Sequence, residues 1–190
     1  ECKARYAGVD WGGGDPTAVV LLGKTASGRI HQFGEFYKVG PVSVIDIAEY
    51  LIEWDRKGPI ASVECDPSEG TSIATLNMGA LKGRVNAADN DRAALGLTAD
   101  LLTQRRLSIG YQCPNSIKEF LGFRWRNRVD PNDHTRYATS TPVEHHADAM
   151  DARRYALKKL LSFETVLSTV GIMSRGNVRK YQGRPVRKFV

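Results

Sequence analysis

The segment Tyr6–Val20 reads YAGVDWGGGDPTAVV, and it predicts how the chain begins to fold. A short apolar run ends on a carboxylate, Asp10, and a glycine-rich turn follows before a second apolar run starts at Thr17. This pattern predicts two strands joined by a tight turn, with an acid at the tip of the first strand. Core packing does not require a carboxylate beside an open glycine turn. A hard metal ion or a phosphate group bound at this place would explain the pattern.

The next segments predict an α/β domain with a mixed sheet. Three strands joined by short turns form an antiparallel meander, and we expect them at 5–11, 17–24 and 29–37. Apolar residues at helical spacing predict a helix at 42–57, and a fourth strand is expected at 60–65. Because the fourth strand returns through a helix, it should lie parallel to the first strand and beside it.

Shorter elements complete the domain, which we expect to span residues 1–162. Further helices are predicted at 71–78, 91–104 and 116–121, and short strands at 83–87 and 107–109. Residues 121–140 alternate arginines with other side chains around a turn, which predicts a protruding β-hairpin. A last helix is expected from 144 to 162. This order places helices on both faces of the sheet.

The positive charge of the chain is concentrated at its C-terminal end. The formal net charge is +6, and six Arg and Lys residues follow Ser174 without an acid. The other 21 basic residues equal the 21 acidic residues in number, so the body of the chain is neutral. For the basic tail, residues 163–190, two interpretations stay open: attachment to nucleic acid or an acidic partner, and a solvated, flexible terminus.

Two features concern the setting of the domain. The chain begins at Glu1 without an initiator Met, which predicts that it is a domain of a longer polypeptide. An uninterrupted apolar run of about eighteen residues, the length that a membrane-spanning helix needs, does not occur in the sequence. We therefore expect no membrane span.

Acidic residues stand at the ends of three predicted elements. Asp10 ends the first strand, and Asp66 ends the fourth, with Glu64 two residues earlier on the same face. Asp148 and Asp151 lie three residues apart near the start of the last helix, so they share a helical face. If the first and fourth strands are parallel neighbours, Asp10 and Asp66 meet at one edge of the sheet, where the helix can add Asp151.

A cluster of carboxylates predicts a bound cation, because like charges repel each other and destabilise the fold. Mg²⁺ or Mn²⁺ fits best, and two such ions about 3.5–4 Å apart can activate a water for phosphodiester cleavage. Each acid also has a structural interpretation. Asp66 could cap the following helix, Asp148 and Asp151 could favour the helix dipole, and Asp15 beside Pro16 is typical of a turn, with at most a supporting role. The combination of three acids at matching element ends favours the metal site.

Arginines are the candidates for holding a DNA backbone. Arg124, Arg126 and Arg128 lie on the predicted hairpin, and Arg105 and Arg106 follow a predicted helix, with Lys82 and Arg84 as further candidates. Phosphate contacts position a duplex without reading its sequence. We therefore expect weak sequence preference and strong salt dependence.

Three motifs resemble those of large terminase subunits from tailed bacteriophages. Gly8–Gly12 with Asp15–Ala18 is similar to the first acidic motif, Val63–Glu69 to the second, and His146–Leu157, reading HADAMDARRYAL, to the third. The resemblance covers residues 5 to 160, with the motifs in order. It implies an RNase H-like nuclease domain that cuts concatemeric viral DNA during genome packaging in the host cytoplasm.

The resemblance also implies roles for particular residues and partners. Asp10, Asp66 and Asp151 would hold two Mg²⁺ or Mn²⁺ ions. Asp148, which stands where some relatives have a histidine, would be an additional ligand. Glu64 competes with Asp66 for the second position, since some relatives place that acid two residues earlier. The expected partners are double-stranded DNA, a preceding ATPase domain of the same polypeptide, the portal and the small terminase subunit.

Other functions are compatible with parts of the pattern. A junction resolvase or transposase-type enzyme uses the same carboxylate geometry. The segment Asp10–Gly14 also resembles the phosphate turn of the actin and sugar-kinase fold, which would give an ATP-binding module. A non-catalytic DNA clamp is a further alternative, but it would leave the clustered acids without a purpose.

Overall fold

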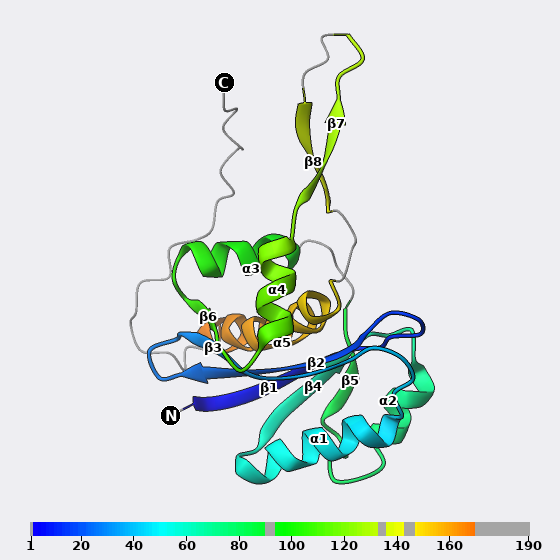
Figure 1. Ribbon diagram of the computed structural model, residues 1–190. Helices are drawn as coiled ribbons and strands as arrows, with labels where there is room; N and C mark the ends of the chain where they lie inside the picture. The colour runs from blue at the N-terminus through cyan, green and yellow to red at the C-terminus, as the bar shows by residue number, and fades with distance from the viewer. Residues whose placement is uncertain (1, 90–93, 133–135, 143–146, 170–190) are drawn as a thin grey trace.

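A six-stranded mixed sheet in the order β5-β4-β1-β2-β3-β6 forms the centre of the molecule (Figure 1). The computed structural model describes residues 2–89, 94–132, 136–142 and 147–169. An antiparallel meander is formed by β1 (Cys2–Asp10), β2 (Thr17–Thr25) and β3 (Ile30–Lys38). The other strands pair in parallel: β4 (Ile60–Cys65) with β1, β5 (Val85–Ala87) with β4, and β6 (Leu107–Ile109) with β3.

Helices cover both faces of this sheet, as Figure 1 shows. One face carries α1 (Val44–Lys57) and α2 (Gly70–Leu76), and the other carries α3 (Ala94–Thr103), α4 (Pro114–Gly122) and α5 (Asp148–Thr169). A separate hairpin of β7 (Trp125–Val129) and β8 (Arg136–Pro142) projects away from the body beyond α4. The predicted fold class is confirmed: three antiparallel strands, then parallel strands, with helices on both faces and a protruding hairpin.

Two apolar clusters, one on each face of the sheet, form the core. On β2, Val19 and Leu21 pack toward α1, whereas Val20 and Leu22 pack toward α5. All four side chains have no exposed surface, which explains why β2 reads as a continuous apolar run rather than an alternating one. The helix α1 begins with a capping box between Ser43 and Asp46, which satisfies N–H groups that lack partners within the helix.

The helix α5 lies directly on β1 at Gly8. A Cβ atom at this glycine would be 1.7 Å from the backbone oxygen of Ala152, so no larger residue fits without moving the helix. The neighbouring small residues Ala149 and Ala156 are also fully buried. This close approach brings the first turn of α5 down to the end of β1, where Asp10 lies.

The observed elements differ from the predicted ones mainly at the C-terminal end. The helix α5 continues to Thr169, so residue 163, where we expected the basic tail to start, lies inside the helix. The apolar spacing of Leu160, Phe163 and Leu167 continues the helical pattern past the predicted end. His145, His146 and most of the basic tail, residues 170–190, lie outside the described residues. Among the described residues, no helix combines the length and apolar character needed to cross a membrane.

The contact at Gly8 predicts the effect of adding one methyl group. Gly8→Ala should lower the free energy of unfolding by at least about 2 kcal/mol, because the new Cβ would overlap a backbone oxygen and force α5 from the sheet. Gly13→Ala is the matched control, since a Cβ at Gly13 meets no atom within 4 Å. Urea denaturation of the two variants and the wild type measures the difference. Equal stability of both variants would show that α5 does not depend on this contact.

Candidate metal centre

The ends of β1 and β4 bring Asp10 and Asp66 to the same edge of the sheet. The two strands pair in parallel up to Val9 and Cys65. The N–H of Asp66 donates to the carbonyl of Val9 at 2.8 Å, and the indole N–H of Trp11 donates to the carbonyl of Asp66 at 3.2 Å. These backbone contacts join the two strand ends, as expected from the crossover through α1.

The carboxylate of Asp66 also has a structural role. Its Oδ1 accepts a hydrogen bond from the N–H of Ser68 at 3.0 Å, which closes a turn after the strand. The helix that follows has Glu69, not Asp66, at its N-cap position, and no side chain caps it there. Asp66 therefore shapes the turn that leads to α2 but does not cap the helix.

Asp148 and Asp151 lie in the first turn of α5, close to the end of β1. The positive end of the helix dipole favours carboxylates at this position. Asp151 Oδ1 accepts a hydrogen bond from Nε of Arg154 at 3.0 Å, Nη2 of the same guanidinium lies 3.0 Å from it in an ion pair, and Arg154 is almost fully buried. A buried guanidinium thus already balances part of the negative charge.

The charges of the three other carboxylates act on Asp10. The pKa of Asp10 is raised to about 8, first by burial and then by the charges of Asp151, Asp66 and Asp148, whereas Arg154 lowers it. Burial raises the pKa of the Tyr155 hydroxyl, and the negative charges of Asp10 and Asp66 raise it further. The three predicted ligands and the additional candidate, Asp148, are therefore brought together at one edge of the sheet.

The composition of this group suits a hard divalent cation. Carboxylate oxygens are the ligands that Mg²⁺ and Mn²⁺ accept, and a cation would relieve the repulsion that raises the pKa of Asp10. Within the described ranges, no three His, Cys, Asp or Glu side chains form a ready-made metal-binding group. The strand ends and the first turn of α5 bring the carboxylates to one edge of the sheet, while Asp151 is bonded to Arg154.

Glu64 lies on the same strand as Asp66 but has other partners. Glu64 is 5% exposed, and its Oε1 accepts hydrogen bonds from Ser62 Oγ at 2.6 Å and Asn86 Nδ2 at 3.0 Å. Lys159 Nζ lies 3.7 Å from the same oxygen. Asp66, and not Glu64, is among the charges that raise the pKa of Asp10. The geometry thus favours Asp66 as the second acid and gives Glu64 a place in a buried polar network under α5.

The glycine-rich turn after Asp10 contains one glycine that the backbone requires. A Cβ at Gly12 would lie 2.0 Å from the carbonyl oxygen of Asp15, whereas Gly13 and Gly14 face open space. Asp15 is exposed and is not one of the charges that raise the pKa of Asp10. It lines a cavity of about 660 Å³ together with Gly14, Pro16, Tyr37, Val39, Asn115, Lys118, Glu119 and Gly122.

The structure places two of the predicted basic residues, Arg105 and Arg106, far from the carboxylates. The carbonyl of Arg106 accepts a hydrogen bond from the N–H of Ile30, and Ile30 pairs with Lys24 of β2. Near the other end of β2, Ala18 pairs with Asp10. From Ala18 to Lys24 the strand extends about 20 Å, so Arg105 and Arg106 lie at the opposite end of the sheet from the carboxylates. They are not part of the candidate centre.

Two further predicted basic sites have clear positions. Arg84 makes two hydrogen bonds to Asp55, at 2.6 and 3.0 Å, and stabilises the body of the domain instead of facing a ligand. Arg124 is exposed between α4 and β7. Arg126 and Arg128 belong to β7, but their side chains lie outside the described part of the chain.

Three residues near the carboxylates were not predicted. Arg154 bonds to Asp151, and this pair has the three-residue spacing that helical sequences use for ion pairs, so the sequence held a signal for it. Tyr37 donates a hydrogen bond to Asp148 Oδ2 at 3.3 Å, and Glu119 lies beside both. Tyr37 and Glu119 come from distant segments, and no sequence spacing connects them to the last helix.

Comparison with known proteins shows the fold. No protein-family model and no curated protein matches the chain. Among solved structures, the large terminase of a thermophilic bacteriophage matches with a TM-score of 0.68 and 21% identity, over 84% of this chain and 40% of that one. The large terminase nuclease domain of bacteriophage SPP1 with bound Mn matches with a TM-score of 0.66 and 22% identity, over 84% and 88% of the two chains. The P22 large terminase nuclease domain matches with a TM-score of 0.56 and 15% identity, over 84% of each.

These similarities show that the chain has the RNase H-like fold of large terminase nuclease domains. The chain spans 40% of the length of the large terminase from the thermophilic bacteriophage, and most of the length of the separate nuclease domains from SPP1 and P22. It thus corresponds in extent to the nuclease part of such a protein.

The raised pKa of Asp10 predicts how stability depends on pH when divalent ions are removed. Because the folded-state pKa of Asp10, about 8, exceeds the ordinary value of 3.8, the wild type should lose stability as the pH rises from 3.8 to about 8, and this loss should level off above about 8. Asp10→Asn removes this charge, so its melting temperature relative to the wild type should increase between pH 5 and pH 9, by about 2–4 °C for each kcal/mol of relieved repulsion. Thermal unfolding in EDTA measures this.

Asp15→Asn is the control for that experiment, because Asp15 is an exposed acid on the same turn. Its melting temperature should follow the wild type at both pH values. If Asp10→Asn and Asp15→Asn behave alike, Asp10 does not carry the repulsion that we assign to it.

Proposed function

We propose that this chain is the nuclease domain of a large terminase, which cuts double-stranded viral DNA by divalent-metal-dependent hydrolysis during genome packaging. One observation supports this most directly: β1, β4 and α5 bring Asp10, Asp66, Asp148 and Asp151 into one electrostatic group. The fold is that of large terminase nuclease domains, and the SPP1 domain was solved with bound Mn. Cutting of concatemeric DNA belongs to this proposal.

In the proposed mechanism, the carboxylates would hold Mg²⁺ or Mn²⁺. Asp10 is affected by the charges of the other three acids, so it would be the central ligand of the group. Asp66 would hold one ion and Asp151 the other, with Asp148 as an additional ligand. The bound ions would supply an activated water and stabilise the charge on the leaving oxygen.

Arg154 supplies a buried positive charge beside one of the proposed ligands. Its guanidinium bonds to Asp151 and compensates that carboxylate in the buried interior.

The proposed partners follow from the same assignment. Double-stranded DNA would be the substrate, and the hairpin arginines Arg124, Arg126 and Arg128 would hold its backbone. A preceding ATPase domain in the same polypeptide is consistent with the greater length of the large terminase from the thermophilic bacteriophage. The portal and the small terminase subunit would be further partners, and the host cytoplasm during virus assembly would be the place of action.

Plasmid nicking tests the proposed cleavage directly. In Mg²⁺ or Mn²⁺ the wild type should convert supercoiled plasmid to nicked and linear forms, and EDTA should stop it. Asp10→Ala, Asp66→Ala and Asp151→Ala should each lower the cleavage activity at least about 100-fold. Removing a residue that only orients a metal ligand typically costs at most about 100-fold. Asp15→Ala is the matched control and should cut like the wild type.

Each outcome of the nicking assay has a definite meaning. Full activity in one of the three variants would exclude that residue from the mechanism. If Glu64→Gln loses cleavage activity while Asp66→Ala keeps it, Glu64 and not Asp66 would be the second metal ligand. Preference for branched over linear duplexes would favour a junction resolvase instead.

Salt dependence tests the role of the hairpin. Replacing Arg124, Arg126 and Arg128 by alanine should weaken DNA binding, and the slope of log affinity against log salt should become less steep by about 0.9 for each phosphate that the variant no longer binds. Arg105→Ala and Arg106→Ala are the controls, since these residues lie at the far end of the sheet. Fluorescence anisotropy with a labelled duplex in Ca²⁺ measures both quantities. Equal slopes for the hairpin variant and the wild type would exclude the hairpin as a DNA-binding element.

A further inference from the structure

The helix α4 contributes a carboxylate to the start of α5. Glu119 is 7% exposed, and its Oε2 accepts a hydrogen bond from the N–H of Met150 at 3.0 Å. The backbone of Ala149 also favours the charged form of this carboxylate, which lowers its pKa. The first N–H groups of a helix have no partner within the helix itself. Glu119 therefore caps α5 from a neighbouring helix.

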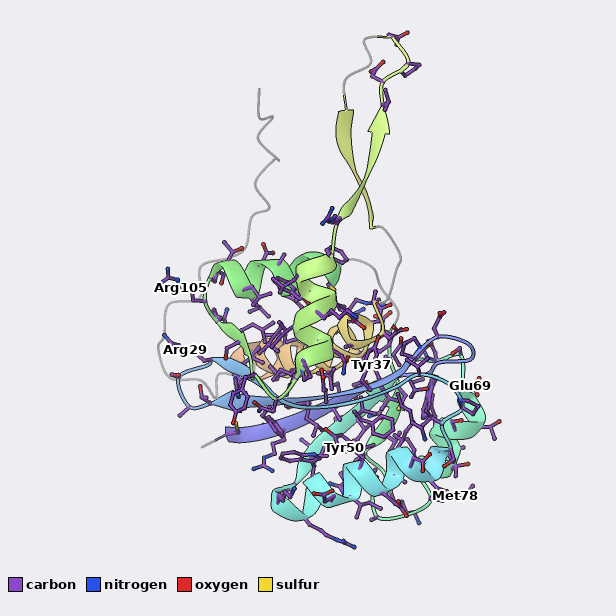
Figure 2. All side chains as sticks on the ribbon, viewed as in Figure 1. Arg29, Tyr37, Tyr50, Glu69, Met78 and Arg105 are labelled. Atoms are coloured by element: carbon purple, nitrogen blue, oxygen red, sulfur yellow. The ribbon has the colours of Figure 1, made fainter. Side chains whose placement is uncertain are left out.

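Tyr37 connects this cap to one of the acids of the candidate centre. Its hydroxyl donates to Asp148 Oδ2 at 3.3 Å, and it also interacts with Glu119. Tyr37 lies near the end of β3, between the sheet and the helices above it (Figure 2). Strand β3, helix α4 and helix α5 therefore meet at a single point, next to Asp148.

The two capped residues, Ala149 and Met150, lie between Asp148 and Asp151 in the sequence. Fixing their N–H groups fixes the backbone that carries both acids. Nearby hydrogen bonds restrain the same helices. Arg153 Nε donates to Gln32 Oε1 at 2.7 Å, and Gln32 Nε2 donates to Ser116 Oγ at 2.6 Å. These groups are buried, so the N-terminal part of α5 is held from β3 and α4 at once.

We propose that Glu119 is a positioning residue of the metal centre: it holds the first turn of α5, and together with Tyr37 the side chain of Asp148, in place opposite Asp10. This rests on the proposed function, because it assumes that the carboxylates bind a divalent ion. Glu119 does not touch the ion; it acts through the backbone of Ala149 and Met150. The helix that carries Glu119 ends at Gly122, and β7 of the hairpin begins at Trp125.

Glu35 offers a matched control within the same chain. Its carboxylate accepts hydrogen bonds from the N–H groups of Asn115 and Ser116, each at 2.9 Å, at the start of α4. It therefore performs the same chemistry as Glu119, one helix farther from the acids. A change that acts only by weakening a helix cap should have the same effect at both positions.

The test measures Mn²⁺ binding to the metal-free protein by calorimetry, together with stability in urea. Glu119→Ala should lower Mn²⁺ affinity by about 10–100-fold, the range typical of groups that orient metal ligands. Glu119→Gln should stay within about threefold of the wild type, because its amide oxygen can accept the same two N–H groups. Tyr37→Phe should lose affinity measurably while keeping wild-type stability. Glu35→Ala should lose stability but keep Mn²⁺ affinity.

Several results would overturn the proposal. The proposal fails if Glu119→Ala binds Mn²⁺ as tightly as the wild type. It also fails if Glu35→Ala loses as much Mn²⁺ affinity as Glu119→Ala does. If Glu119→Ala does not fold, Glu119→Gln and Tyr37→Phe test the proposal in its place. A large loss in Glu119→Gln, or unchanged affinity in Tyr37→Phe, would contradict the mechanism.

A second measurement separates this proposal from the proposed function. Amide hydrogen exchange at Ala149 and Met150 in EDTA should be faster in Glu119→Gln than in the wild type, faster still in Glu119→Ala, and unchanged in Glu35→Ala. If the wild type binds no Mn²⁺ and cuts no DNA, the proposed function fails, even where exchange confirms the cap. If the wild type binds and cuts but exchange is unchanged in Glu119→Ala, the positioning role alone fails.

Discussion

The whole candidate centre depends on the contact between α5 and β1 at Gly8. Because residue 8 has no side chain, the backbone of Ala152 can rest on the strand, and the helix begins just above its end. Asp148 and Asp151 thereby come into electrostatic contact with Asp10. A helix held farther away by an ordinary side chain would leave these charges apart. The absence of a Cβ atom at residue 8 therefore lets the carboxylates of α5 come close to Asp10.

Gathering carboxylates has an energetic cost that the surroundings offset only in part. Asp10 is partly buried and affected by three other acids, so its pKa is far above the usual range. The N-terminus of α5 and the guanidinium of Arg154 supply positive charge, but neither removes the repulsion. A divalent cation would do so. The same arrangement that destabilises the unliganded protein at high pH is therefore the one that favours metal binding.

The side of the centre next to α4 is organised by two carboxylates that cap helices, one half-buried and one buried. Glu35 on β3 caps α4, and Glu119 on α4 caps α5. Each acceptor satisfies N–H groups that a helix leaves unpaired, and each joins two elements that are distant in sequence. Burying a carboxylate is costly unless hydrogen bonds compensate it. The chain of caps runs from the sheet to the first turn of α5, and it ties the hairpin-bearing helix to the acids.

Periodicity and the crossover rule were sufficient to predict the sheet, the layers and the meeting of Asp10 with Asp66, because alternation shows which face a strand buries. They could not decide between Asp66 and Glu64, which share a face and differ only in their partners. They also could not place Arg106 or find Glu119. Sequence spacing encodes contacts within an element, whereas contacts between distant segments arise only when whole elements pack. The sequence by itself therefore determined the element ends at which the acids stand, and only the tertiary structure, through the packing of whole elements, decided which side chains lie near one another at the candidate centre.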